Sequence, residues 1–294
     1  CQDPENYKYS LVDMPELLDA VAGHYERRYG VHIEHDEIMS INGSQEGIAH
    51  IAMALCDAED VVLVPNPGYP IFSVGPVTYD LRPENHFLPD FDSISEEVAK
   101  KAKFMIVSYP LNPVCVTAND QMYEELIRFA EKYQIIVLHD NAYSDIIYGG
   151  RKGGSFLAYD GAKDVGVEFY SLSKSYNLTG ARISFVIGNK EIISKFKTVR
   201  SQIDYGVFKP VQYGAIAALN GPQDAWAPIP DGYVSSEQFC MDLADKTGVI
   251  CTPGSSFGSL GSRYVRFALV RDVPTMEKIV QIIDESGILK NRVN

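Results

Sequence analysis

Short apolar runs alternate with helical patterns between about residues 37 and 220, and this alternation constrains the fold more than any other feature. The apolar runs cover residues 38–41, 61–64, 77–81, 104–107, 135–138, 169–172 and 183–187. Helical patterns precede or separate them, for example at 93–102 and 119–133. Runs that are apolar on both faces are typical of a mostly parallel sheet covered by helices. We therefore expect a mixed, mostly parallel sheet in a three-layer α/β/α large domain over residues 37–224.

The pattern changes after about residue 225. Strands are expected at 226–229, 248–252 and 264–269, and helices at 235–246 and 274–286. We predict a smaller α+β C-terminal domain over residues 225–294, with residues 1–36 as an N-terminal segment.

Charge and composition exclude several classes of function. The 294-residue chain has a formal net charge of −13, which argues against nucleic acid or an anionic membrane as the main partner. No apolar run approaches the roughly 18 residues that span a bilayer. The five cysteines and six histidines show no metal-ligand spacing, so we expect no metal site and a reduced, cytoplasmic protein.

Polar residues stand just beyond several of the apolar runs. They are Ser44, Tyr69, Asn112, Asp140, Tyr143 and Lys174. In sheets of this kind ligands bind beyond the carboxyl ends of the strands. We therefore predict that these residues form a single site.

The segment 42–47, Asn-Gly-Ser-Gln-Glu-Gly, joins an expected strand to an expected helix. The free backbone N–H groups and the dipole of such a helix start favour an anion. The alternative is a capped helix that binds nothing. Lys174, taken alone, would be an ordinary loop lysine.

The wider pattern resembles a known family. Ser171-x-Ser173-Lys174 with Arg182 is similar to the cofactor-lysine motif of class I/II aminotransferases, the aspartate aminotransferase-like pyridoxal-phosphate enzymes of fold type I. Asn112-Pro113, Asp140-x-x-Tyr143 and Arg266 occur in the family's order. The intervals of 28 residues from Asn112 to Asp140 and 8 from Lys174 to Arg182 also match, so the resemblance covers nearly the whole chain.

The resemblance implies pyridoxal 5'-phosphate as cofactor and assigns the catalytic residues. Lys174 would form a Schiff base and move the proton at the substrate α-carbon. Asp140 would keep the ring nitrogen protonated. Tyr143 and Asn112 would bind the phenolic oxygen of the ring.

The remaining site residues follow from the same resemblance. The cofactor phosphate would bind Ser44, Gln45, Ser171, Ser173 and Arg182, and Tyr69 would stack on the ring. Arg266, with Asn112, would bind the substrate carboxylate. Tyr9 would reach the phosphate of the other subunit, which implies a homodimer with shared sites; Tyr7 or simple packing are alternatives for this position. The N-terminal segment 1–36 would belong to the small domain and the interface.

The chain also departs from the family. The usual N-P-T-G reads Asn112-Pro-Val-Cys115 here, so the loop loses its glycine. The steps at Pro76-Val77 and Asp224-Ala225 are abrupt where the family carries more chain, and we expect segments to be missing there.

The leading functional hypothesis is ping-pong transfer of an amino group between an amino acid and a 2-oxo acid. A C–S β-lyase, a ring-forming elimination or a decarboxylase on the same fold is an alternative. A cofactor-sensing domain of a transcription regulator is a further one, disfavoured because no basic DNA-binding segment is present. A plain nucleotide-binding protein lacks its G-x-G-x-x-G. The donor stays open among aspartate, aromatic, alanine and diaminopimelate types.

Overall fold

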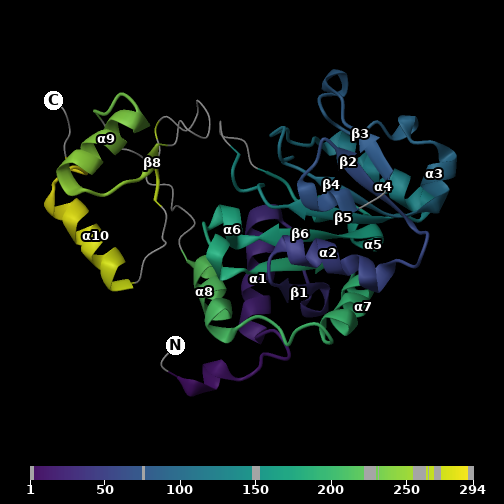
Figure 1. Cartoon of the computed structure of the whole chain (residues 1–294), viewed down its shortest axis with the longest axis horizontal. Helices are drawn as coiled ribbons and strands as arrows, with labels where there is room; N and C mark the ends of the chain where they lie inside the picture. The colour runs from purple at the N-terminus through teal and green to yellow at the C-terminus, as the bar shows by residue number, and fades with distance from the viewer. Residues whose placement is uncertain are drawn as a thin grey trace. The chain divides into compact units, whose positions relative to one another are not determined.

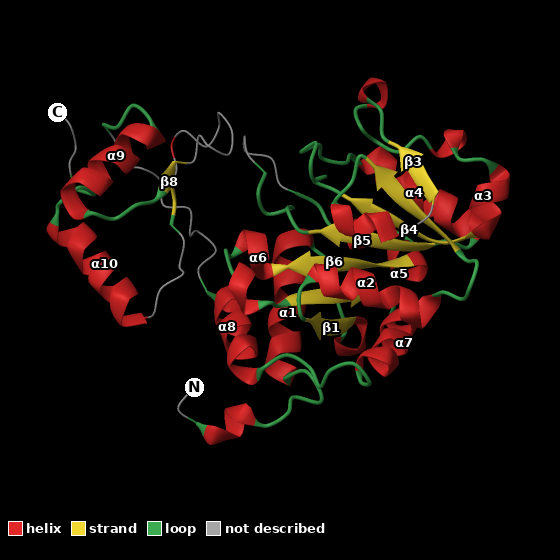
Figure 2. Ribbon diagram, in the orientation of Figure 1, coloured by secondary structure: helices red, strands yellow, loops and turns green. Residues whose placement is uncertain are grey.

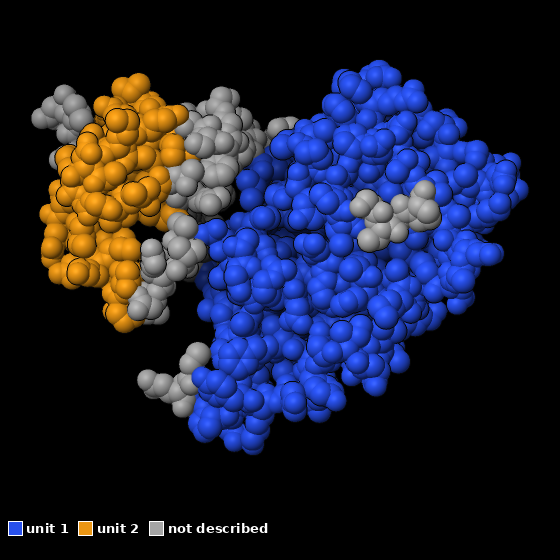
Figure 3. All heavy atoms as spheres, viewed as in Figure 1, with its two compact units in different colours: residues 1–147, 152–221 blue, residues 148–151, 222–294 orange. Residues whose placement is uncertain are grey.

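The computed structural model describes residues 3–74, 77–147, 153–221, 230, 232–253, 263, 265–267 and 273–290. The chain divides into two compact units (Figure 3). Unit 1 comprises residues 1–147 and 152–221, and unit 2 comprises residues 148–151 and 222–294. The two units are described separately.

Unit 1 is built on a mixed sheet (Figures 1 and 2). Its strands are β1 (Ile38–Ile41), β2 (Val61–Asn66), β3 (Val77–Asp80), β4 (Ala102–Ser108), β5 (Ile136–Asn141), β6 (Gly166–Ser171) and β7 (Ser184–Gly188). They lie in the order β1-β7-β6-β5-β4-β2-β3. β7 runs antiparallel to β1 and β6, and the other neighbours are parallel. The predicted mostly parallel mixed sheet is confirmed.

Helices cover both faces of this sheet. They are α1 (Pro15–Tyr29), α2 (Ser44–Leu55), α3 (Glu96–Lys101), α4 (Asp120–Tyr133), α5 (Ala162–Val165), α6 (Leu172–Ser175), α7 (Lys190–Arg200) and α8 (Lys209–Asn220). Alternate residues of a strand point to opposite faces. Accordingly Val137 packs in the core formed with α1, α4 and α8, and Leu138 in the core formed with α2 and α7. The result is the expected three-layer arrangement.

Local sequence explains where the helices start and stop. Pro15 occupies the first turn of α1, and Gly30 ends it with a left-handed φ of 68°. Asn119 caps α4 by accepting the Met122 N–H at 2.9 Å. α4 buries Met122, Leu126 and Ala130, as its helical pattern predicts.

The N-terminal segment packs within unit 1. Leu17, Val21 and Tyr25 of α1 are buried in the core that α1 shares with α8 and the sheet. The predicted division at 36/37 and 224/225, with the first segment belonging to the small domain, stays a prediction.

The described residues of unit 2 form two helices and a short strand pair. These are α9 (Ser236–Thr247), α10 (Val273–Glu285), β8 (Thr252–Pro253) and β9 (Val265–Arg266). β8 and β9 pair antiparallel, with Thr252 opposite Arg266. Both helices occur where predicted; the strand expected at 226–229 lies outside the described residues. Among the described residues, no helix combines the length and apolar character needed to cross a membrane.

Candidate active site

The sheet register brings the predicted site residues of unit 1 to one edge. Asp140, near the end of β5, lies opposite Ser108 of β4 and Phe169 of β6. Ser171, at the end of β6, lies opposite Ser184, which in turn lies opposite Ile41. Neighbouring strands are about 4.8 Å apart. The segments that follow β1, β4, β5 and β6, and the one that precedes β7, therefore meet at this edge.

Arg182 lies against the start of α2. Its Nη2 donates to the Asn42 carbonyl at 3.3 Å, and its Nη1 donates to the Thr179 carbonyl at 3.0 Å. Gly43, the N-cap of α2, has a φ of 102°, and a Cβ there would lie 2.1 Å from Arg182 Nη2. Gly43 is therefore required by both its backbone conformation and the guanidinium. The two features predicted to bind an anion are adjacent.

Serine hydroxyls extend this polar corner. Ser171 Oγ accepts the Ser173 N–H at 3.2 Å and the Ser184 hydroxyl at 2.9 Å. Ser171 and Ser173 are buried, whereas Ser44 is half-buried. The Ser44 hydroxyl oxygen is nevertheless inaccessible and has no hydrogen-bond partner among the described residues. A buried hydroxyl without a partner is costly in a protein, so this one has an unused hydrogen-bonding capacity that a ligand could meet.

Lys174 lies within α6, directly after β6, and its side chain is exposed. Gln45 is also exposed, in the first turn of α2. The Lys174 amine is thus accessible at the edge where Ser171 and Asp140 lie.

Asp140 is the most perturbed acid of this edge. Its carboxyl is 9% exposed, and Oδ1 has no hydrogen-bond partner in the part of the chain that the structure describes. Burial raises the Asp140 pKa to about 6; the His139 charge lowers it and the Glu168 charge raises it. A buried carboxylate with a free oxygen suits a cationic N–H donor.

Tyr143 and Asn112 lie beside Asp140. Asn112 Nδ2 donates to the Tyr143 hydroxyl at 3.4 Å. Burial raises the Tyr143 pKa, the Asn112 hydrogen bond lowers it and the Asp140 charge raises it. Tyr69 is 37% exposed, and its ring packs edgewise on Phe72 with centroids 6.1 Å apart.

The loop after Asn112 keeps a glycine-type backbone without a glycine. Cys115 has a φ of 57°, in the left-handed region. Its N–H donates to the Leu111 carbonyl at 2.6 Å, and its thiol is exposed. The turn is therefore formed here with a cysteine in the left-handed position.

Two predicted residues are not brought to this edge within unit 1. Tyr9 is 76% exposed, and its ring contacts Tyr205 with centroids 4.8 Å apart. Arg266 ends β9 in unit 2. The roles of both stay predictions.

Sequence reasoning missed a buried polar cluster behind the site. It includes His139, Asn141 and Glu168, all with no exposed surface. A glutamate inside the buried run Gly166-Val-Glu-Phe-Tyr170 was the available signal.

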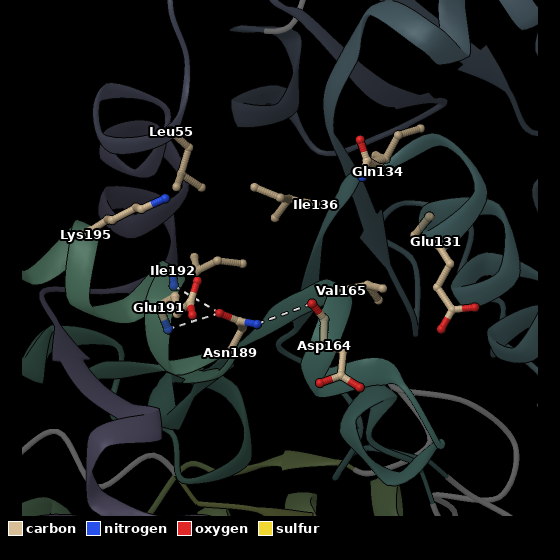
Figure 4. A pocket seen from close by; sticks show the side chains of 12 residues that line it. Leu55, Glu131, Gln134, Ile136, Asp164, Val165, Asn189, Glu191, Ile192 and Lys195 are labelled. Atoms are coloured by element: carbon tan, nitrogen blue, oxygen red, sulfur yellow. Dashed lines mark hydrogen bonds between the residues drawn. The ribbon is translucent and has the colours of Figure 1, made fainter.

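A separate hollow of about 360 Å³ lies at the opposite edge of the sheet (Figure 4). It is lined by residues that include Leu55, Gln134, Ile136 and Asn189, and by none of the predicted site residues. The Asn189 side chain accepts the N–H groups of Glu191 and Ile192 at 3.0 and 3.1 Å and donates to the Asp164 carbonyl at 3.3 Å. These bonds cap α7, so Asn189 here is structural.

Comparison with known protein families shows the family of this chain. Residues 2–228 match the family model for aminotransferase class I and II. The chain belongs to this family. It is therefore a pyridoxal-phosphate-dependent aminotransferase, a transferase of amino-acid biosynthesis that moves an amino group between an amino acid and a 2-oxo acid.

Relatives cover nearly the whole chain. The LL-diaminopimelate aminotransferase of Aquifex aeolicus is 38% identical over 333 residues, covering 98% of this chain and 85% of the relative. That of Dehalococcoides mccartyi is 39% identical and covers 94% of this chain and 82% of the relative. A 333-residue alignment is longer than this 294-residue chain, so the Aquifex relative carries segments that have no counterpart here.

Solved structures agree on the fold. BacF from Bacillus subtilis, in its substrate-bound structure, is similar with a TM-score of 0.74 and 30% identity, covering 100% of this chain and 86% of that one. A probable N-succinyldiaminopimelate aminotransferase from Thermus thermophilus has a TM-score of 0.70 and 31% identity, covering 97% and 88%.

The described residues of the aminotransferase fit its cofactor. The unpaired Asp140 oxygen fits a pyridinium N–H, and the unpaired Ser44 hydroxyl beside Arg182 fits a phosphate. Tyr143, which is close enough to Asp140 to feel its charge, presents a hydroxyl hydrogen-bonded to the Asn112 amide, and these two polar groups fit a ring hydroxyl.

Proposed function

We propose that this aminotransferase uses an amino donor with the diaminopimelate skeleton, passing one amino group to a 2-oxo acid. The observation that carries the proposal is 38–39% identity to LL-diaminopimelate aminotransferases across 94–98% of the chain. A solved structure named for the N-succinyl derivative of the same skeleton is 31% identical.

We assign the chemistry to residues at the sheet edge. Pyridoxal phosphate, when bound, supplies an electron-withdrawing ring that stabilises negative charge at the substrate α-carbon. The exposed Lys174 amine would act as the base that takes the proton from the substrate α-carbon, and then as the acid that returns it to the carbon on the other side of the transferred amino nitrogen. Asp140 would be the carboxylate partner of the ring nitrogen and, by staying ionised, would keep that nitrogen protonated.

We assign the other site residues to holding the cofactor and orienting the substrate. The cofactor phosphate would be bound by Arg182, Ser44, Gln45, Ser171 and Ser173. The N-terminus of α2 and the Arg182 guanidinium supply positive charge there. Tyr143 and Asn112 bind the ring hydroxyl, and Tyr69 covers the ring face. Arg266 binds the α-carboxylate through its bidentate fork.

The test is a panel of amino donors in single half-reactions. Purified enzyme is mixed with LL-diaminopimelate, N-succinyl-LL-diaminopimelate, aspartate, phenylalanine or alanine, and loss of the visible cofactor band gives kcat/KM. We expect LL-diaminopimelate to exceed aspartate, phenylalanine and alanine by at least about tenfold. A preference for any of those three would contradict the donor assignment. Production of pyruvate and a thiol from a cysteine-type substrate, without amino transfer, would favour the lyase.

We also propose a cytoplasmic homodimer with shared sites. Exposed apolar side chains from the N-terminal segment and from residues 201–208 support an interface. They are Tyr7, Tyr9, Leu11, Val12, Ile203, Tyr205 and Phe208. The Tyr7 ring contacts the Phe208 ring and the Tyr9 ring contacts the Tyr205 ring, so exposed apolar side chains of the two segments lie side by side. The cytoplasmic location is supported by the biosynthetic role of the relatives and by scattered cysteines.

A further inference from the structure

The buried Glu168 carboxylate lies behind the residue proposed to protonate the cofactor. Glu168 stands in β6 directly opposite His139 of β5, and neither side chain is exposed. Alternation along β5 sends His139 and Asn141 to one face of the sheet and Asp140 to the other. Glu168 therefore faces the two residues that flank Asp140.

Glu168 accepts hydrogen bonds from several elements. His139 Nδ1 and the Phe156 N–H lie 2.9 Å from Oε2. Tyr25, Asn141 and Ser155 donate to Oε1 at 2.7, 3.0 and 2.9 Å. The far nitrogen of His139 lies 3.1 Å from the Tyr123 hydroxyl.

This arrangement allows the carboxylate to stay charged. Burial raises the Glu168 pKa, but the hydrogen bonds and charge of His139, with hydrogen bonds from Asn141 and Tyr25, hold it below its ordinary value. A buried charge is tolerated only when it is fully hydrogen-bonded, and loss of a donor is expensive. The network is consequently stiff. Because Glu168 is buried, its carboxylate cannot exchange one of these donors for a water molecule.

We propose that Glu168 acts with His139 and Asn141 as a positioning clamp for Asp140. Both neighbours of Asp140 are tied to a single carboxylate on the next strand, so the end of β5 cannot twist about its axis. Asp140 is thereby held on the opposite face in the orientation that the ring nitrogen requires. The remaining donors, Tyr25, Ser155 and Phe156, anchor the carboxylate but do not adjoin Asp140.

This difference supplies a matched pair of variants. Asn141→Ala and Ser155→Ala each remove one donor to Glu168 Oε1, at 3.0 and 2.9 Å, from fully buried positions. Both variants are expected to lower the melting temperature. Only Asn141→Ala loosens the strand end that carries Asp140.

The experiment measures pyridoxal-phosphate affinity of the cofactor-free protein, and then kcat and KM with whichever amino donor supports turnover. We expect Asn141→Ala to weaken cofactor binding and to lower kcat by about tenfold. This is the lower end of the effects known for residues that position metal ligands without touching the metal, which serve here as the analogy. KM for the donor should stay within about twofold. Ser155→Ala should keep kcat and cofactor affinity within about twofold.

If Asn141→Ala and Ser155→Ala have equal kcat and equal cofactor affinity, the proposal that Glu168 positions Asp140 is wrong. If Asn141→Ala does not fold, Asn141→Ser replaces it, with the same expected contrast in smaller size. The inference does not depend on the identity of the donor, because cofactor affinity is measured without any substrate.

Discussion

The buried Asp140 carboxylate lowers the free energy of unfolding of the cofactor-free protein. Burial raises its pKa from an ordinary 3.8 to about 6, so ionisation is disfavoured in the folded state. The cofactor's ring nitrogen would supply the missing partner. Asp140 therefore costs stability in the cofactor-free protein and would favour cofactor binding.

Asp140→Asn should therefore stabilise the cofactor-free protein at neutral and higher pH. The folded pKa lies above the unfolded one, so the cost of the charge is fully present above about pH 6 and vanishes below about pH 4. At about 1.4 kcal/mol per pKa unit, the gain at pH 8 is about 2–3 kcal/mol. Urea unfolding at pH 8 and pH 4 measures it. An equal effect at both pH values would argue against a buried ionised carboxylate.

Cys115 offers a second test at the residue scale. Its φ of 57° is unfavourable for a residue with a Cβ. Cys115→Gly should raise the free energy of unfolding by about 0.5–1 kcal/mol, because relief of the left-handed backbone exceeds the added entropy of the unfolded chain. Cys115→Ala, which keeps the Cβ, is the control and should change stability little. Thermal unfolding that ranks alanine above glycine would contradict this reading.

At the scale of elements, the start of α2 and the segment before β7 lie together and form the corner that we propose binds the phosphate. The helix start was predictable from Gly43 and Ser44, and the arginine from its spacing to Lys174. Their adjacency follows from the pairing of β1 with β7, which places strands that are distant in sequence side by side. Pairing of this kind depends on tertiary packing and is not encoded in a local pattern.

Gly43→Ala should weaken pyridoxal-phosphate binding by about tenfold or more, because the added methyl displaces the Arg182 guanidinium. Binding of pyridoxal, which lacks the phosphate, should change much less. Fluorescence titration of the cofactor-free protein measures both.

Gly30→Ala is the control for backbone strain. Its φ is also positive, at 68°, but nothing lies within 4 Å of the added Cβ. It should cost about 1 kcal/mol of stability and leave cofactor affinity unchanged. Equal loss of pyridoxal and pyridoxal phosphate binding in Gly43→Ala would show that the effect is not at the phosphate.

The limits of sequence reasoning appear in β5 and β6. Their apolar runs are recognisable in the sequence, but the Glu168 network is not, because the donors to Glu168 come from α1 and the segment 153–156 as well as from the sheet. Hydrogen bonds across 143 residues, as between Tyr25 and Glu168, have no sequence period. Motif order and spacing identify Lys174, Asp140 and Arg182 in the sequence. Their roles in binding the cofactor stay predictions.

At the scale of the whole molecule, the exposed patch that includes Tyr9, Ile203 and Tyr205 bears on assembly. We expect the protein to sediment as a dimer at micromolar concentration, and Ile203→Asp to shift it toward monomer by placing a charge in the apolar interface. Met53→Asp, on the exposed side of α2, is the control and should remain dimeric. A monomeric wild-type protein would contradict the homodimer proposal.

In the proposed mechanism, Lys174 is the residue that binds the cofactor covalently. Purified protein loaded with pyridoxal phosphate is reduced with borohydride, digested and mapped by mass spectrometry. We expect the cofactor mass to appear on the peptide that contains Lys174, and Lys174→Ala to remove both this adduct and the visible absorbance band. An adduct on another lysine, or a visible band that survives in Lys174→Ala, would contradict it.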